Sequence, residues 1–316
     1  MSNVRHPKRI TMTIAIAWVR TLRDCEELVF VSDSRLSGDG LNFDACPKVL
    51  TLPRSDCVIA FAGYTGHAYP MMQQLALAID AYAPARRGSL DVTALKSHAL
   101  KVFDGMKDLL RSSPNCSIPQ SEEPSADFLF GGYSWVKKQF ELWEISFNSR
   151  EGRFVAHAAQ WLSHIAHVPH VDLRRTKEAN GSRPIARIAL AGDQRDRALG
   201  ILRDRLKPSG EDPEATKLDM QPFEVVRDML RDPRHAETIG GAPQLVKVYQ
   251  YMQAAPLAVY WPSKSSGAAH LQGRPCLGYE RIDRWIFDPD ALRSERPAHS
   301  RGDVDDDIPE AAGPDA

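Results

Sequence analysis

The sequence predicts an α+β protein in which two antiparallel sheets lie between helical layers, as a four-layer αββα sandwich. Three observations predict this fold. Short β-rich runs fill the first 63 residues, two segments with helical spacing follow them, and the same order repeats in the second half. Hydrophobic residues make up 43% of the 316-residue chain, which is typical of a protein that folds around a core.

Four strands are predicted in the first half. Ile14, Ile16 and Trp18 alternate with threonine and alanine, which is the period of two that marks a strand. A polar stretch separates this segment from a second β-rich run, as in an antiparallel hairpin. Gly63 ends the fourth run at a turn. The strands are predicted over residues 11–19, 28–31, 49–52 and 57–62.

Two helices are predicted next. Apolar residues recur at helical spacing over 71–79 and again over 95–110, and Asp91 is positioned to cap the second helix. Residues 113–125 contain three prolines among serines and glutamates, which is typical of a loop.

The second half repeats this order. Strand-like runs come first, two helical segments follow, and two strands close the pattern. The first of these helices follows Asp193, and the second places Phe223, Val226 and Leu230 on one face. The strands are predicted at residues 128–131, 140–145, 185–191, 246–249 and 257–260.

The chain is predicted to divide into four parts. Residues 1–10 form an N-terminal extension or propeptide, residues 11–262 form the main domain, and residues 263–290 form a C-terminal extension. Residues 291–316 carry several aspartates and prolines and no aromatic residue, so they bury too little apolar surface to offset their ordering entropy. We expect them to be a disordered acidic tail.

The charge balance argues against several classes of protein. Lys and Arg number 40 against 41 Asp and Glu, which gives a net charge of -1. Binding of nucleic acid or of a membrane surface through bulk charge is therefore not expected. No apolar run approaches the roughly 18 residues that span a bilayer, and the first ten residues lack the apolar stretch of a secretory signal. We expect a cytoplasmic protein with no membrane partner.

Four short signals that carry chemistry lie within the first 63 residues. A threonine, Thr11 or Thr13, stands at the start of the first strand. Asp33 lies in a Ser-Asp-Ser-Arg turn after the second strand, Lys48 precedes the third, and Gly63 leads into the first helix. Each signal alone is weak, because such turns and strand ends are usually only structural. Their order and spacing give them weight.

In this order the set resembles the N-terminal nucleophile hydrolases, specifically proteasome β-subunits and their simpler bacterial peptidase relatives. The resemblance covers roughly residues 11–262 and is strongest in the first 63 residues. It implies an N-terminal threonine hydrolase that cleaves peptide or other amide bonds. The matching segments are Thr13-Ile14, Asp33-Ser34-Arg35, Lys48, Ala62-Gly63, Ala191-Gly192-Asp193 and Ile239-Gly240-Gly241-Ala242.

The resemblance implies a role for each residue of the first set. Thr13 would be the nucleophile, with Asp33 and Lys48 as a charge pair beside it. Arg35 would give structural support, and the backbone N–H of Gly63 would face the oxyanion, where such a donor is worth about 2.7–4 kcal/mol.

The chemistry of this class depends on an amine. A threonine hydroxyl needs a base beside it, and here the base is the threonine's own α-amine, usually acting through a water. Its reference pKa of about 7.7–8.0 suits a general base near neutral pH. A lysine cation nearby favours the neutral amine and lowers the pKa of the hydroxyl. Asp193 falls where a supporting serine is expected.

Two routes lead to a threonine with a free amine. Translation from Met12 followed by removal of that methionine would expose Thr13, whereas cleavage of a propeptide after Ile10 would expose Thr11. Both threonines point to the same face of a strand, because they are two residues apart. We favour Thr13, because relatives that cleave themselves usually have glycine where Ile10 stands.

Two alternative functions remain. Ala236 and Ile239 fall near the family's auxiliary aspartate and serine, which support the amine, and neither can hydrogen-bond through its side chain. One alternative is therefore a catalytically silent scaffold or ring component. The other is a small-molecule acylase that uses the same chemistry.

The resemblance also suggests partners. It implies a peptide or amide substrate, self-assembly into a ring and a separate ATPase, because the chain itself has no Walker-type loop. No cofactor is implied. His164, His167 and His170 form an H-x-x-H-x-x-H pattern, which we interpret as a surface loop rather than a metal site, because Pro169 interrupts it.

Overall fold

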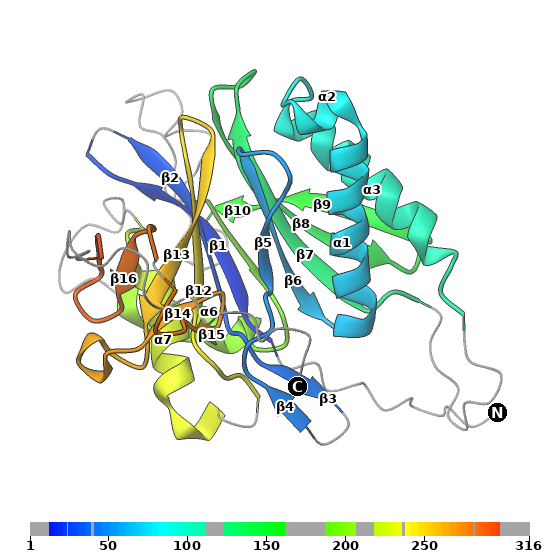
Figure 1. Cartoon of the computed structure of the whole chain (residues 1–316). Coiled ribbons are helices and arrows are strands. Elements are labelled where there is room, and N and C mark those ends of the chain that lie inside the picture. Colours follow the sequence, from blue (N-terminus) through cyan, green and yellow to red (C-terminus); the bar gives the residue numbers. More distant parts are fainter. Residues whose placement is uncertain are drawn as a thin grey trace, which may run out of the picture.

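Three β-sheets and five α-helices make up the part of the chain that the computed structural model describes (Figure 1). The two larger sheets face each other, and helices cover the outer face of each. The described residues are 13–23, 25–38, 41–111, 123–161, 187–206, 218–235, 238–280 and 282–297.

The smaller of the two main sheets has five antiparallel strands. In the order in which they pair, these are β5 (Val49–Thr51), β6 (Cys57–Gly63), β7 (Ala126–Ser134), β8 (Gln139–Asn148) and β9 (Arg153–Ala158). Its outer face is covered by α1 (Thr65–Ala81) and α3 (Val92–Lys107), and the short helix α2 (Ala83–Arg86) joins them (Figure 1). Aromatic rings fill this core. Phe103 of α3 stacks on Phe128 of β7, with the ring centroids 4.6 Å apart.

The larger sheet has ten strands. Its main path runs β10 (Gln160–Trp161), β11 (Arg187–Ala191), β1 (Ala15–Thr21), β2 (Glu26–Ser32), β12 (Gln244–Tyr249), β13 (Gln253–Tyr260), β14 (Ala269–Leu271) and β15 (Arg274–Pro275). Strand β16 (Ile286–Asp288) pairs with β13 and with β17 (Arg293–Glu295). Helices α6 (Arg195–Leu206) and α7 (Gln221–Arg231) pack on its outer face, and the 3-10 turns are η2 (Pro233–His235) and η3 (Lys264–Ser266).

The alternation along β1 separates two packing environments. Ile16 and Trp18 lie in the core between the ten-stranded sheet and its helices, whereas Ala15 and Ala17 lie in the core between the two sheets. Thr13 continues the alternation of the two alanines. Its side chain is therefore directed between the sheets, at the point where β1 begins.

The predicted fold class is wrong in its sheets. The sequence predicts two antiparallel sheets in a four-layer αββα sandwich, but the described chain forms three sheets, and β13 and β16 pair in parallel. The third sheet is the hairpin of β3 (Leu36–Gly38) and β4 (Leu41–Phe43), which projects from one end of the molecule (Figure 1). Strands of three residues are too short to show a periodic pattern, so the sequence gives no sign of them.

Two other local predictions have different outcomes. Asp91 caps α3 as predicted, because its carboxylate accepts the N–H of Thr93 at 3.0 Å. The predicted tail is wrong at its start, because residues 293–295 form β17 within the large sheet. Strands β14 to β17 likewise make residues 263–290 a continuation of that sheet.

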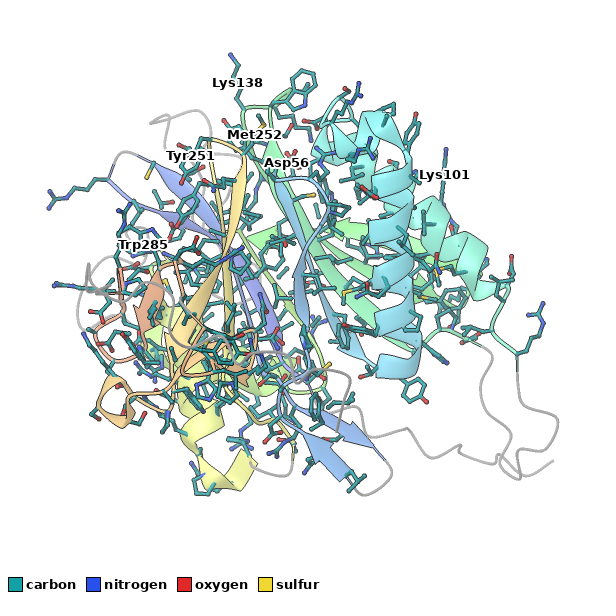
Figure 2. The ribbon with its side chains drawn as sticks, viewed as in Figure 1. Asp56, Lys101, Lys138, Tyr251, Met252 and Trp285 are labelled. Atoms are coloured by element: carbon teal, nitrogen blue, oxygen red, sulfur yellow. The ribbon has the colours of Figure 1, made fainter. Side chains whose placement is uncertain are left out.

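The two ends of the molecule differ. Tyr251 and Met252, in the turn between β12 and β13, lie near Asp56 at one end (Figure 2). The β3–β4 hairpin projects from the opposite end, where β1 begins and β2 ends (Figure 1). None of the helices within the described ranges is long and apolar enough to cross a membrane.

Replacement of Phe103 by alanine tests the aromatic core under α3. Loss of the stacked ring leaves a cavity against Phe128, so we expect the free energy of unfolding to fall by about 3–5 kcal/mol. Leu77→Ala on the exposed side of α1, where Leu77 is 60% exposed, is the control and should change stability by no more than about 0.5 kcal/mol. Urea denaturation measures both, and equal stability of the two variants would contradict this packing.

Candidate active site

Three polar side chains from separate segments meet between the two main sheets, at the end of the molecule near β3. Thr13 lies two residues before β1, Asp33 directly follows β2, and Lys48 directly precedes β5. Lys48 Nζ lies 2.9 Å from Asp33 Oδ1 and 3.2 Å from Thr13 Oγ1. All three are nearly excluded from solvent, with exposed fractions of 4% for Thr13, 0% for Asp33 and 1% for Lys48. The fold thus brings together three residues that the sequence singles out.

The pairing of β1 with β2 sets Asp33 opposite the start of β1. Ala15 pairs with Ser32, so the next residues outward, Ile14 and Asp33, face each other. The N–H of Ile14 donates to Asp33 Oδ1 at 3.2 Å, and the N–H of Asp33 donates to Ile14 O at 3.3 Å. A slip of one residue in this register would break both bonds and redirect the carboxylate.

Lys48 reaches this pair from the facing sheet. Its backbone C=O accepts the N–H of Phe61 in β6 at 3.1 Å, which fixes the chain just before β5. Its ammonium group extends to Asp33, which directly follows β2 of the ten-stranded sheet. The ion pair therefore joins the two sheets at the position of the Thr13 hydroxyl.

Burial disfavours the charged form of Asp33, whereas the neighbours of its carboxylate favour that form. Loss of solvent raises the pKa of Asp33, whereas the Lys48 ammonium and the backbone N–H groups of Ile14 and Arg35 act to lower this pKa. The N–H of Arg35 donates to Asp33 Oδ2 at 3.1 Å, so both carboxylate oxygens accept hydrogen bonds. Removal of one partner from a buried pair leaves the other charge uncompensated, so Asp33 and Lys48 depend on each other.

Arg35 braces the turn that carries Asp33. Its guanidinium forms a bidentate pair with Asp44, in which Nε and Nη2 each lie 2.6 Å from a carboxylate oxygen. Hydrogen bonding to Asp44 raises the pKa of Arg35. The guanidinium also lies against Gly240, where any side chain would overlap it. The turn is thereby held against the glycine pair that precedes β12.

A turn before α6 holds both backbone ends of Thr13. Asp193 Oδ1 accepts the N–H of Thr13 at 2.8 Å, and the N–H of Gln194 approaches Thr13 O at 3.5 Å. Gly192 has a φ of +104°, and a methyl group on it would overlap Thr13 O. Only glycine allows the backbone to come this close. Asp193, which the resemblance places near Thr13, is in direct contact with it.

Gly63 lies at the end of β6, two residues beyond the bond that Phe61 makes with Lys48. Its φ is +103°, and a methyl group on it would lie 2.8 Å from Ser125 O. Among the described residues, no hydrogen bond joins Gly63 to Thr13. Its role as an oxyanion donor therefore stays a prediction.

Other residues of the sequence analysis are not part of this arrangement. Thr11 and Ala236 lie outside the described residues, as do His164, His167 and His170. Ile239 is buried in the apolar core between the ten-stranded sheet and its helices. Within the described ranges, no group of three or more His, Cys, Asp or Glu side chains is arranged to hold a metal ion.

Gln244 is a residue of the site that sequence reasoning missed. Its Oε1 accepts the N–H groups of Lys48 and Val49 at 2.8 and 3.1 Å. Its Nε2 donates to Cys46 O at 2.6 Å and approaches Asp33 O at 3.4 Å. The amide, 1% exposed, thus links the backbones on both sides of the charge pair. The only sign of this in the sequence is a polar residue that opens an apolar strand.

Comparison of the sequence with known protein families finds no matching family, and no curated protein matches it. A function for this chain must therefore be argued from the geometry of these residues and from the resemblance of their order to that in N-terminal nucleophile hydrolases.

Gln244→Glu tests the amide link with almost no change of shape. The new carboxylate oxygen would face the carbonyl oxygens of Cys46 and Asp33, where the amide donates, so we expect the free energy of unfolding to fall by about 1–3 kcal/mol. The same substitution at the exposed residue Gln253 of β13 is the control, with an expected change within about 0.5 kcal/mol. Chemical denaturation of both variants at neutral pH measures the difference. A Gln244→Glu protein as stable as its control would contradict the link.

Proposed function

We propose that this chain is an N-terminal threonine hydrolase, similar to proteasome β-subunits, that cleaves peptide or other amide bonds. One observation carries the proposal. The Thr13 hydroxyl lies 3.2 Å from the Lys48 ammonium, which is paired with Asp33, while the Thr13 nitrogen lies 2.8 Å from Asp193. This chemistry needs a nucleophile, a cation that lowers the pKa of its hydroxyl, and an amine, which the held Thr13 nitrogen becomes when Thr13 is the first residue.

The active form is proposed to begin at Thr13. With that residue first, its nitrogen becomes an α-amine, which is a base of suitable pKa within reach of its own hydroxyl. Two charges act on this amine in opposite directions. Lys48 favours its neutral form, and Asp193 favours its protonated form.

The reaction runs by acyl transfer in two steps. Thr13 Oγ1 forms a bond with the substrate carbonyl carbon while its proton passes to the α-amine, directly or through a water. The tetrahedral intermediate collapses when the carbon–nitrogen bond breaks, and the leaving amine takes that proton. Water then attacks the resulting threonine ester, releases the acid and returns the proton to Oγ1.

Other nucleophiles near the charge pair are less suited to the reaction. Cys46 lies two residues before Lys48, but burial raises the pKa of its thiol, so little thiolate forms at neutral pH. The hydroxyl of Ser34 is buried between the carbonyl oxygens of Asp44 and Ala242. Thr13 has its hydroxyl beside the cation and is therefore the proposed nucleophile.

Assembly and location are part of the same proposal. The resemblance favours a cytoplasmic enzyme that associates with copies of itself in a ring and receives substrates from a separate ATPase. Leu41 and Phe43 are exposed on the projecting β3–β4 hairpin, which supports a contact with another chain there.

Thr13→Ala separates the proposed enzyme from a catalytically silent scaffold. We expect hydrolysis of fluorogenic peptide amides and of a panel of acyl amides to fall by at least about 10³-fold, because no hydroxyl remains beside Lys48. Thr13→Ser, which keeps the hydroxyl, should retain measurable activity. Thr51→Ala, at an exposed position of β5, is the control and should match the parent. A Thr13→Ala protein with parental activity would contradict the proposal.

The free amine is tested on the same preparations. An α′,β′-epoxyketone needs both the threonine hydroxyl and its α-amine to close a ring adduct. Mass spectrometry of the intact labelled protein should therefore show a chain that begins at Thr13 and carries one adduct. A labelled chain that retains Met12 would contradict this route.

Asp193→Asn tests the carboxylate at the amine. Removal of its negative charge takes away the group that favours the protonated amine, while Lys48 remains, so the amine should lose its proton at lower pH. We expect the acidic midpoint of the kcat/KM profile to move down by about 1 pH unit. Asp196→Asn in α6, with a side chain that is 95% exposed, changes the net charge equally and should leave the midpoint in place. Equal midpoints in both variants would argue against an ion pair at the amine.

A further inference from the structure

The segment that follows residue 262 contributes a tight turn to the surroundings of the site. Strands β14 and β15 form a hairpin in which Leu271 pairs with Arg274. The two residues between them, Gln272 and Gly273, have φ angles of 53° and 87°. Positive φ at both central residues is what a two-residue type I′ turn requires. The hairpin lies at the end of the molecule where β1 begins (Figure 1).

The tip of this hairpin packs against the turn that carries Asp33. Gly273 is buried, and a methyl group on it would lie 2.7 Å from Ser34 Oγ and would overlap Ser34 Cβ. The same methyl group would lie 3.5 Å from Ala45 Cα. The backbone of Gly273 is therefore in direct contact with Ser34, with no room for a side chain.

Ser34 is held by hydrogen bonds on its other sides. Its N–H donates to Gly240 O at 3.0 Å, and its C=O accepts the N–H of Cys46 at 2.9 Å. Its Oγ lies 2.8 Å from Ala242 O and 3.1 Å from Asp44 O. A residue held in this way cannot move away from an added methyl group without moving its neighbours.

The neighbours of Ser34 are connected to the charge pair of Asp33 and Lys48. Asp33 directly precedes Ser34. The residue whose N–H donates to the Ser34 C=O is Cys46, which lies two residues before Lys48. The attraction between the two charges is strong only because they are 2.9 Å apart and excluded from water. A shift of Ser34 therefore changes the position of Lys48 relative to the Thr13 hydroxyl.

We propose that the β14–β15 hairpin is a positioning element of the active site, in which Gly273 fixes Ser34 and thereby keeps Asp33 and Lys48 at the distance that the reaction at Thr13 requires. The proposal rests on the proposed threonine hydrolase function. Gly273 is a positioning residue, because it acts through Ser34. The segment after residue 262 is then part of the catalytic scaffold rather than an appendage to it.

Gly273→Ala tests this contact, with Gly267→Ala as a matched control. Gly267 lies in the same segment and has a φ of +78°, but no atom lies within 4 Å of the place that its methyl group would take. Both variants therefore carry an alanine in a left-handed conformation. Only Gly273→Ala also presses on Ser34.

We expect Gly273→Ala to lower kcat by about 10- to 100-fold, with KM within about twofold of the parent. Gly267→Ala should leave both constants within about twofold. The rates are expressed per active site, and the active sites are titrated with the α′,β′-epoxyketone. A loss of folded protein therefore does not lower the measured kcat. The acidic midpoint of the kcat/KM profile should also move in Gly273→Ala and not in Gly267→Ala, because the charge pair acts on the amine. A Gly273→Ala protein with the parental kcat per titrated site and the parental midpoint would overturn the proposal.

A second comparison decides the question if Gly273→Ala does not fold. Ser34→Gly removes the Cβ that the hairpin tip touches, and the double variant Ser34→Gly/Gly273→Ala puts a methyl group back into that space from the other side. We expect the double variant to have a kcat about 10-fold above that of Ser34→Gly alone. Equal kcat values in these two variants would overturn the proposal.

Failure of the proposed function has a different signature. It appears as a Thr13→Ala protein that is as active as the parent. Activity that depends on Thr13 but is insensitive to the Gly273 and Ser34 variants overturns only the role of the hairpin.

Discussion

The buried ion pair between Lys48 and Asp33 is the interaction on which the rest of the site depends. It joins the two main sheets, and both of its members are removed from solvent, which costs several kcal/mol for each ion. Hydrogen bonds from Ile14 and Arg35 to the carboxylate offset part of that cost. Even so, a well-packed apolar pair would often be as stable at such a position, so stability alone does not explain these charges. The proposed chemical role would explain them, because the other group that the Lys48 ammonium contacts is the Thr13 hydroxyl.

Strand pairing, rather than loop conformation, sets the geometry of this site. The register of β1 with β2 places Asp33 opposite Ile14, and the pairing of β5 with β6 fixes the backbone of Lys48. Gln244 then ties these two segments to each other through a single amide. Groups that are placed by sheets hold their distances better than groups on free loops, which a reaction at a fixed nucleophile requires.

The order of the short signals, and the resemblance it carries, was enough to predict which residues meet, although each signal alone is typical of an ordinary turn or strand end. Thr13, Asp33, Lys48 and Asp193 could be named in this way. Gln244 could not, since its bonds run to residues nearly 200 positions away and glutamine has no pattern of its own. The number of sheets was predicted wrongly for a related reason. Strands of two or three residues, such as β3, β4 and β14 to β17, are too short to show a local period, so the sequence gives no sign of them.

Glycines that allow a close backbone approach lie at three points around the site. Gly192 lies against Thr13 O, Gly240 against the Arg35 guanidinium, and Gly273 against Ser34, and each contact has no space for a methyl group. Glycine loses more conformational entropy on folding than any other residue, so three such positions make the folded chain less stable than alanine-compatible contacts would. The three contacts hold Thr13, the Arg35 guanidinium and the turn that carries Asp33. Such contacts are not confined to the site, since Gly132 approaches Asp56 O at the opposite end of the molecule just as closely. At the site, they help to keep a hydroxyl, an ammonium and a carboxylate within hydrogen-bonding distance.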